Sequence, residues 1–401
     1  MIMGRDSRRR TLEVIIRVFS LLIYAVTFVL SYQCLCAAQI DVEKNVSKNR
    51  IIYLWLAILL PCILAGLRAD TVGVDVGVYV VRDVKYGAIS QSLKQLQDLM
   101  SSESELLYCV LVYISTRLTS DAGMLLFLLQ LLSIAPCVKA FCLLKDRISV
   151  PLAYLIYLLY FYNTSLNLMR QAVACSFILM GMAYLHSEKK HRLFKAILSF
   201  IVAILFHKAA FIGIILLLLL EIFSKFKGKY TIKLLLFIGI CLLPTLLMKS
   251  TDYLMSNPNI PYRYKFYLSV FVYHDSHEGY FVNPFSLYTL ADLLFKALLV
   301  LIPVYFAHQV KRNNEEIVLE NICLSGFLIY TIVLFSMKTA YGNRISMFLD
   351  YFIMLFAPYV IPERLLSKRK FVYEGLLLMS WLIMVMYLGS SGSQNYMFRF
   401  I

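Results

Sequence analysis

Long apolar runs, separated by short polar links, recur along almost the whole chain of 401 residues. Several of them approach the roughly 20 residues that an α-helix needs to cross the ~30 Å hydrocarbon core of a bilayer. Hydrophobic residues make up 60% of the chain and charged residues only 16%, a composition that excludes an ordinary water-soluble domain. The runs are continuous and do not alternate, which favours helices over a membrane β-barrel. The sequence therefore predicts an all-α transmembrane helical bundle that occupies residues 1–401 as a single domain.

The apolar pattern predicts about thirteen membrane spans. Their expected ranges are 12–39, 51–67, 105–118, 122–143, 149–163, 167–185, 193–206, 209–223, 232–248, 286–308, 317–336, 345–361 and 371–389. Two longer connections, 68–104 and 249–285, are expected outside the membrane or at its surface, the second as an external loop rich in aromatic residues. The spans that meet at His207 are short, a pattern that also fits a broken or tilted helix.

Basic residues give the chain a formal net charge of +15, and they gather in the short links between spans. Cytoplasmic links of membrane proteins carry an excess of Lys and Arg, so this charge indicates orientation and not nucleic-acid binding. Alternation of the spans then places four polar segments together on the opposite, external face. They are the segment from Asn163 to Arg170, the turn at His207 and Lys208, the 249–285 connection and the turn 337–344. The same rule does not fix the side of 68–104, where acids match or exceed bases.

Three cationic side chains at the ends of apolar runs are candidate site residues, because polar groups near membrane depth are costly. Arg170 stays charged and can bind phosphate oxygens in a bidentate fork, although it can also snorkel to the membrane interface. His207 can take a proton from a hydroxyl near neutral pH, or serve as a structural histidine. Arg344 opens a further apolar run, where interfacial anchoring is the alternative.

A polar fragment follows the second span and contains Arg68, Asp70, Gly73, Asp75, Gly77 and Tyr79. Its glycines permit a tight backbone path, and its carboxylates can bind a sugar hydroxyl or act as a base. The spacing matches neither of the common glycine-rich phosphate motifs.

The 249–285 connection carries many aromatic rings together with Arg263. Rings of this kind stack on the C–H faces of sugars, and they also anchor loops at membrane interfaces. His274 and His277 lie in the same connection, but no H-E-x-x-H helix or cysteine supports a metal site. We expect no metal and no cofactor.

Three short islands of the sequence carry a resemblance to a known family. They are Arg68 through the Gly73-Val-Asp75 step to Tyr79, the run Asn167-Leu-Met-Arg170-Gln171-Ala-Val-Ala174, and Phe206-His207-Lys208-Ala-Ala. Glu105, and Arg344 with Tyr351 and Phe352, are similar in placement. The constellation resembles the EpsG-type proteins of exopolysaccharide and O-antigen clusters, within the Wzy-like polysaccharide polymerases. The family's usual Gly-Thr-Asp and His-Lys-Ser steps are Gly-Val-Asp and His-Lys-Ala here.

The resemblance implies polymerisation of undecaprenyl-diphosphate-linked oligosaccharide repeat units at the outer face of the bacterial inner membrane. Its expected catalytic residues are His207 and Asp75. Its expected substrate-binding residues are Arg68, Tyr79, Arg170, Gln171, Lys208, Arg263 and Arg344. The expected partners are the lipid-linked substrate, the lipid bilayer, and chain-length regulator and flippase proteins, with no nucleic acid.

Other membrane functions use similar residues. A flippase for lipid-linked oligosaccharides also needs cations within a bundle, but its charges are expected in a central cavity between repeated halves, and the sequence has no evident repeat. A ligase or another lipid–sugar transferase uses nearly the same chemistry. A structural membrane scaffold would not require Arg170, His207 and Arg344 on one side.

Overall fold

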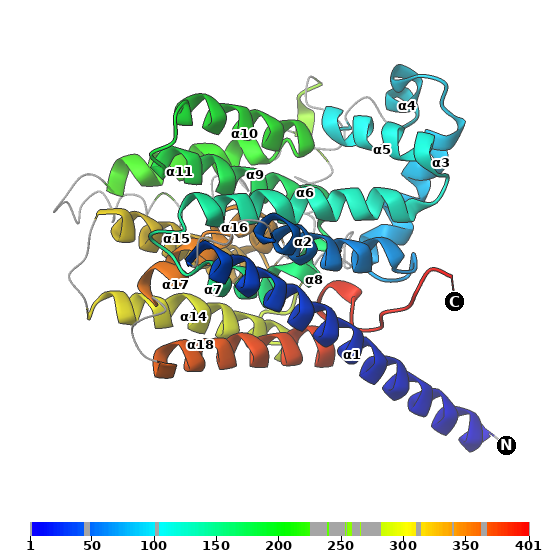
Figure 1. Cartoon of the computed structure of the whole chain (residues 1–401). Helices are drawn as coiled ribbons and strands as arrows, with labels where there is room; N and C mark the ends of the chain where they lie inside the picture. The colour runs from blue at the N-terminus through cyan, green and yellow to red at the C-terminus, as the bar shows by residue number, and fades with distance from the viewer. Residues whose placement is uncertain are drawn as a thin grey trace. The chain divides into compact units, whose positions relative to one another are not determined.

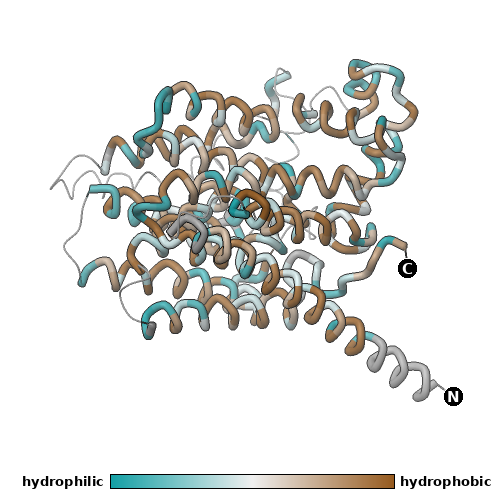
Figure 2. The backbone as a smooth tube through the Cα atoms, viewed as in Figure 1, coloured by the Kyte–Doolittle hydropathy of each residue, from teal (hydrophilic) through white to brown (hydrophobic). Residues whose placement is uncertain are grey.

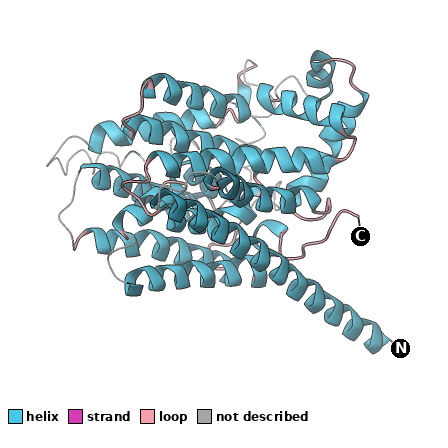
Figure 3. Ribbon diagram, viewed as in Figure 1, coloured by secondary structure: helices cyan, strands magenta, loops and turns pink. Residues whose placement is uncertain are grey.

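The computed structural model describes residues 2–43, 49–100, 104–224, 282–309, 314–338, 341–361 and 367–400, with isolated positions at 239, 253, 255–258 and 265. Within these residues every regular element is a helix, and the only β contact is an isolated bridge between Arg68 and Phe398 (Figure 3). The all-α prediction is confirmed for the described residues. The chain divides into two compact units, unit 1 from Met1–Ile212 with Ala357–Ile401, and unit 2 from Gly213–Phe356. That residues 1–401 form one domain stays a prediction.

Unit 1 combines helices from both ends of the chain (Figure 1). In order they are α1 (Ile2–Glu43), α2 (Arg50–Leu67), η1 (Val76–Val80), α3 (Val81–Ile89), α4 (Leu93–Met100), α5 (Leu106–Leu118), α6 (Ala122–Leu143), α7 (Val150–Ile156), η2 (Tyr157–Phe161), α8 (Tyr162–Ser165), α9 (Met169–His186), α10 (Arg192–Phe206), α18 (Ser367–Ser380), η5 (Trp381–Tyr387) and η6 (Ser390–Gly392). Helix α2 packs against α1 and α6, and α9 packs against α6 and α10. The α9 helix is therefore central to the part of unit 1 that carries the predicted site residues.

Unit 2 contains α14 (Leu287–Ala307), α15 (Asn314–Met337) and α16 (Tyr341–Asp350). Helix α15 packs against both α14 and α16. Helix α11 (Ala210–Ser224) leads from unit 1 into unit 2, and α17 (Ile353–Val360) leads back.

Each expected apolar segment except 232–248, of which only Gly239 is described, coincides with a helix or with consecutive helices. Hydrophobic residues predominate along most of these helices (Figure 2). Among the described residues, six helices are long and apolar enough to cross a membrane. They are Glu13–Gln39, Arg50–Leu67, Ala122–Leu143, Leu287–Ala307, Asn314–Ser336 and Lys368–Tyr387. The chain is thus a membrane protein, but the expected number of about thirteen spans is not confirmed, because many of the helices are too short or too polar to span.

Residues 68–104 were expected as a connection at or outside the membrane surface. They form the helical segments η1, α3 and α4, which turn buried side chains toward α5. Their position relative to a membrane stays a prediction, as does that of 249–285, most of which lies outside the described residues.

Pro61 lies inside α2 and has no N–H to donate to the carbonyl of Ala57, one helical turn earlier. The hydroxyls of Ser31 and Tyr154 donate to that carbonyl instead, at 2.7 and 2.6 Å. These two side chains come from α1 and α7, so neighbouring helices supply the hydrogen bonds to the α2 backbone that Pro61 cannot make.

Segment 389–399 returns to the C-terminal end of α2. The Tyr396 hydroxyl donates to the Leu64 carbonyl, and the Arg399 N–H donates to the Leu67 carbonyl, both at 2.8 Å. Carbonyls in the last turn of a helix have no partner within it. A segment distant in sequence therefore caps α2 at the point where the predicted polar fragment begins.

Candidate active site in unit 1

The polar turn that follows α2 lies against the segment that leads into α9. The Asp75 N–H donates to Asn167 Oδ1 at 2.9 Å, and Arg68 Nη2 donates to the sulfur of Met169 at 3.3 Å. Gly73 has a φ of +94°, and a Cβ at this position would lie 3.0 Å from a backbone carbonyl of the second segment. Glycine permits this close approach. Two of the three sequence islands are therefore neighbours in the fold.

Glu105, the residue directly before α5, joins Arg170 and His207. Its Oε2 atom lies 2.7 Å from Arg170 Nη1, and its Oε1 atom lies 3.3 Å from His207 Nδ1. The Glu105 side chain is only 2% exposed, whereas those of Arg170 and His207 are 27% and 22% exposed. A buried carboxylate thus holds two side chains that both reach the surface, and the second and third islands meet at this residue.

The charge of Glu105 is stabilised by its two partners. Burial opposes ionisation, but the hydrogen bond with His207 and the positive charge of Arg170 outweigh it and lower the pKa of Glu105 to about 2. The carboxylate is therefore ionised at neutral pH. An Nδ1–H of His207 directed at this carboxylate leaves Nε2 as the basic nitrogen of the imidazole.

Tyr108 provides a second support for Arg170. The guanidinium carbon of Arg170 lies 5.0 Å from the centroid of the Tyr108 ring, within the range of a cation–π interaction. The Tyr108 hydroxyl donates to Asp83 Oδ2 at 2.9 Å. Asp83 on α3 is buried and also pairs with Arg82 at 3.0 Å. The amphipathic α3 helix therefore orients the ring on which Arg170 rests.

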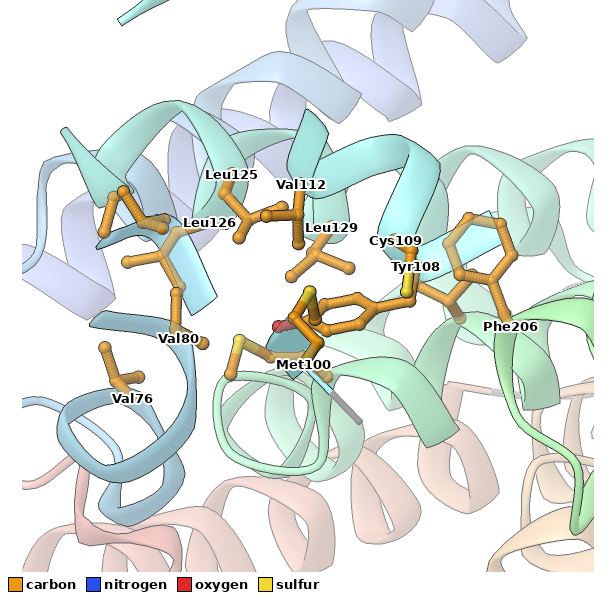
Figure 4. Close-up of a cluster of buried hydrophobic side chains, with 14 of the residues drawn as sticks. Val76, Val80, Met100, Tyr108, Cys109, Val112, Leu125, Leu126, Leu129 and Phe206 are labelled. Carbon is orange, nitrogen blue, oxygen red and sulfur yellow. The ribbon is translucent and has the colours of Figure 1, made fainter. Parts of the chain in front are cut away.

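A cluster of buried apolar side chains fixes the elements that carry these groups (Figure 4). It includes Tyr108 one turn after Glu105, Met169 directly before Arg170, and Phe206 directly before His207. Arg170 and His207 thus directly follow a residue of this core, and Glu105 lies one helical turn before one. Close packing of this kind restricts side-chain motion, so the site is pre-organised.

Helix α10 ends at Phe206, and His207 has an extended backbone with φ −157° and ψ 109°. Helix α11 begins three residues later, at Ala210. The expectation of a broken helix at His207 is thus confirmed. At this break, Nδ1 of the imidazole lies 3.3 Å from Glu105 Oε1.

The model of the EpsG family matches residues 51–400 of this chain. The chain belongs to the EpsG family. The comparisons with curated proteins and with solved structures found no match. The matched range includes Glu105, Arg170 and His207.

The other predicted residues of this EpsG-family protein in unit 1 have different surroundings. Gln171 is buried in the first turn of α9, Asp75 is half-buried, and Tyr79 and Lys208 are exposed. The guanidinium carbon of Arg82 lies 5.6 Å from the centroid of the Tyr79 ring. The proposed contacts of these four residues with substrate stay predictions.

Two predicted residues lie outside unit 1 as it is described. Arg263 falls outside the described residues. Arg344 is exposed on α16 of unit 2. Its expected place beside Arg170 and His207 stays a prediction.

Unit 2 of this EpsG-family protein contains a charged cluster that the sequence analysis did not single out. Lys296 Nζ on α14 lies 2.7 Å from Asp350 Oδ2 and donates to Ser346 Oγ at 3.0 Å. The same ammonium lies 4.0 Å from the centroid of the Tyr330 ring. A single lysine inside an apolar span is a signal that could have revealed this cluster, because such charges are costly in a membrane.

The geometry of the Glu105 site suits acid–base chemistry on an anionic substrate. Arg170 supplies a permanent positive charge, and His207 supplies an oriented proton acceptor within the same short distance of one carboxylate. Neither side chain is buried, so both remain within reach of a bound molecule.

Proposed function

We propose that this protein polymerises undecaprenyl-diphosphate-linked oligosaccharide repeat units by glycosyl transfer, at the outer face of the bacterial inner membrane. The observation that carries the proposal is that Arg170 and His207 pair with the two different carboxylate oxygens of Glu105. Membership of the EpsG family supports a role in polysaccharide biosynthesis.

In the proposed reaction, a hydroxyl oxygen of the acceptor unit attacks the anomeric carbon of the growing chain. The bond from that carbon to the diphosphate oxygen breaks, and undecaprenyl diphosphate leaves with the electron pair. His207 Nε2 takes the proton of the acceptor hydroxyl, while Arg170 neutralises the departing diphosphate. Since diphosphate is already a good leaving group, the main contribution of the protein is alignment of two membrane-bound substrates.

The remaining predicted residues complete this scheme as proposals. Arg344 is expected to contact the same diphosphate as Arg170, and Asp75 with Arg68 is expected at the other substrate. A flippase that delivers repeat units and a regulator of chain length are the expected protein partners.

The test is incubation of the purified chain in lipid nanodiscs with a defined undecaprenyl-diphosphate repeat unit, followed by gel analysis of the products. A ladder of products is expected. In proteoliposomes, movement of the substrate across the membrane without elongation would instead support a flippase and contradict the proposal.

A pair of histidine variants makes the test specific. His207→Gln is expected to abolish the ladder. His308→Gln is the matched control, because His308 Nε2 also lies near a carboxylate, 3.5 Å from Glu320 Oε1, but in unit 2 and 61% exposed. It is expected to leave the ladder intact. A normal ladder from His207→Gln would remove this residue from the reaction.

A further inference from the structure

Arg68 is a buried cation whose hydrogen-bonding capacity is largely unused. The residue is 1% exposed, and Nη2 donates to the sulfur of Met169 at 3.3 Å. The described part of the chain offers no acceptor to its Nε and Nη1 atoms. A thioether is a weak acceptor, and a buried charge without a counter-ion is costly. This arrangement is typical of a site that an anion completes.

Among the residues that the structure describes, no carboxylate forms an ion pair with Arg68. Its polar neighbours include the hydroxyls of Tyr24, Tyr162 and Tyr396. Each hydroxyl donates its proton to a backbone carbonyl, at 3.0, 2.8 and 2.8 Å. Burial lowers the pKa of Arg68 to about 10, so the guanidinium still carries its charge at neutral pH.

Asp70, two residues after Arg68, and Asp121, directly before α6, are both engaged by Arg399. Arg399 Nη2 lies 2.7 Å from Asp70 Oδ1, and Arg399 Nη1 lies 3.0 Å from Asp121 Oδ2. Arg399 therefore pairs with Asp70, the acid nearest to Arg68 in sequence, and its own positive charge acts on Arg68.

The N-terminus of α9 adds an independent preference for an anion. Met169, which Arg68 contacts, is the first residue of this 18-residue helix, and Leu168 before it provides no side-chain cap. The N-terminus of a helix carries partial positive charge and presents N–H groups to anions. Arg170 follows in the same turn. The Arg170 guanidinium itself is held by Glu105, so Arg68 and the helix end are the groups that meet at this location.

Segment 389–399 closes this location. The Ala69 N–H donates to the Met397 carbonyl at 2.8 Å, and Arg68 pairs with Phe398 in the isolated bridge. Residues paired in this way without direct hydrogen bonds present their side chains on the same face. Gly389 and Gly392 have φ values of +75° and +64°, a left-handed conformation that glycine permits and that turns the chain at the start of the segment.

We propose that Arg68 and the first turn of α9 form a phosphate subsite, which segment 389–399 covers until the diphosphate of a polyprenyl lipid displaces it. The subsite rests on the proposed function, because joining two lipid-linked units requires two diphosphate groups to be held at once. Arg170 beside Glu105 serves one of them, and Arg68 serves the other.

The proposal predicts that ligand binding frees segment 389–399. The full chain in nanodiscs is titrated with undecaprenyl diphosphate without sugar, and deuterium uptake is measured for peptides that cover 67–75 and 389–400. Uptake is expected to rise at saturation. An equal rise with inorganic diphosphate would assign the subsite to a free anion and overturn the lipid assignment. No rise with either compound would overturn the subsite itself.

Two arginine variants separate binding from structure. Arg68→Met removes a charge without a counter-ion, so the midpoint of thermal unfolding is expected to stay equal or rise. The concentration of undecaprenyl diphosphate that opens the segment is expected to rise about tenfold or more. Arg117→Met is the matched control, because its guanidinium donates to the carbonyls of Gly87 and Ser90. It is expected to lower the unfolding midpoint and leave opening unchanged. A lowered midpoint with normal opening in Arg68→Met would overturn the proposal.

A variant in segment 389–399 tests whether this segment covers the subsite, without altering Arg68. Phe398→Ala weakens the packing of the segment, so uptake without ligand is expected to rise, and the ligand concentration for half-maximal opening is expected to fall in proportion. An unchanged ligand concentration for half-maximal opening would contradict the proposal that segment 389–399 covers the subsite. These experiments require no turnover. If a product ladder forms but opening of segment 389–399 does not depend on Arg68, only the phosphate subsite is contradicted. If opening depends on Arg68 but no ladder forms, only the proposed polymerase function is contradicted.

Discussion

The carboxylate of Glu105 and the guanidinium of Arg170 come from positions 65 residues apart, yet their Oε2 and Nη1 atoms lie 2.7 Å from each other. This ion pair connects the start of α5 with the start of α9. It also brings His207 to the other oxygen of the same carboxylate. The candidate site is therefore organised around an acid, although its expected ligand is an anion.

The first prediction concerns pH and the stability of unit 1. Glu105 has a pKa of about 2 in the folded chain against an ordinary value of 4.5, so its stabilising effect is complete above about pH 4.5 and is lost as pH falls toward 2. The loss amounts to about 3 kcal/mol. Unfolding of wild type and Glu105→Gln, followed from pH 6 to pH 2, checks this. The variant is expected to be less stable at pH 6 and to lose about 3 kcal/mol less than wild type between pH 6 and pH 2; parallel curves would refute the role of Glu105.

The second prediction concerns the fork of Arg170. Arg170→Lys preserves the charge and can preserve the pair with Glu105, so membrane abundance is expected to be unchanged. The rate of ladder formation is expected to fall about tenfold or more, because an ammonium cannot bind phosphate in a bidentate way. Arg147→Lys changes a partly exposed arginine that pairs with Glu188, and it is the control, with an unchanged rate expected. Full activity of Arg170→Lys would argue against a bidentate contact.

The third prediction separates the ring of Tyr108 from its hydroxyl. Tyr108→Phe removes the hydrogen bond to Asp83 and is expected to cost about 1–2 kcal/mol of stability while ladder formation continues, because the ring under Arg170 remains. Tyr108→Leu removes both and is expected to slow the ladder as well. Tyr305→Phe, at a 64% exposed tyrosine, is the control for loss of a hydroxyl. Equal ladder rates for the two Tyr108 variants would show that the ring does not support Arg170.

The fourth prediction concerns the buried pair of unit 2. Lys296→Met leaves Asp350 without its cation and is expected to cost about 3–5 kcal/mol. The double variant Lys296→Met with Asp350→Leu is expected to recover most of that stability, because neither charge remains buried. The midpoint of thermal unfolding of the purified chain measures both. A double variant as unstable as the single one would mean that the pair is not what stabilises this cluster.

Much of the helix pattern could be predicted from sequence, because long apolar runs and their polar ends are local features. The break at His207 followed from the short runs on either side of it. The number of about thirteen spans is not confirmed, since apolar helices such as α5 and α10, with 13 and 15 residues, are shorter than the length that crosses a membrane. Apolar runs identify buried helices as readily as membrane-spanning ones.

Two of the three residues that meet at Glu105 could be singled out from the sequence, but their contacts could not. Arg170 and His207 stood out as polar groups next to apolar runs, whereas Glu105 was noted only for its placement. Its role depends on two contacts between distant segments, and no sequence period encodes them. The burial of Arg68 was missed for the same reason, because segment 389–399, which covers it, is more than 300 residues away.

The discontinuous makeup of unit 1 has a consequence for biogenesis. Segment 389–399 emerges from the ribosome only after all of unit 2, yet it supplies partners for carbonyls in the last turn of α2. The last turn of α2 therefore lacks these hydrogen-bond partners in the translocon or the bilayer while most of the polypeptide is still being synthesised. Unit 1 can consequently reach its final packing only after unit 2 has been synthesised.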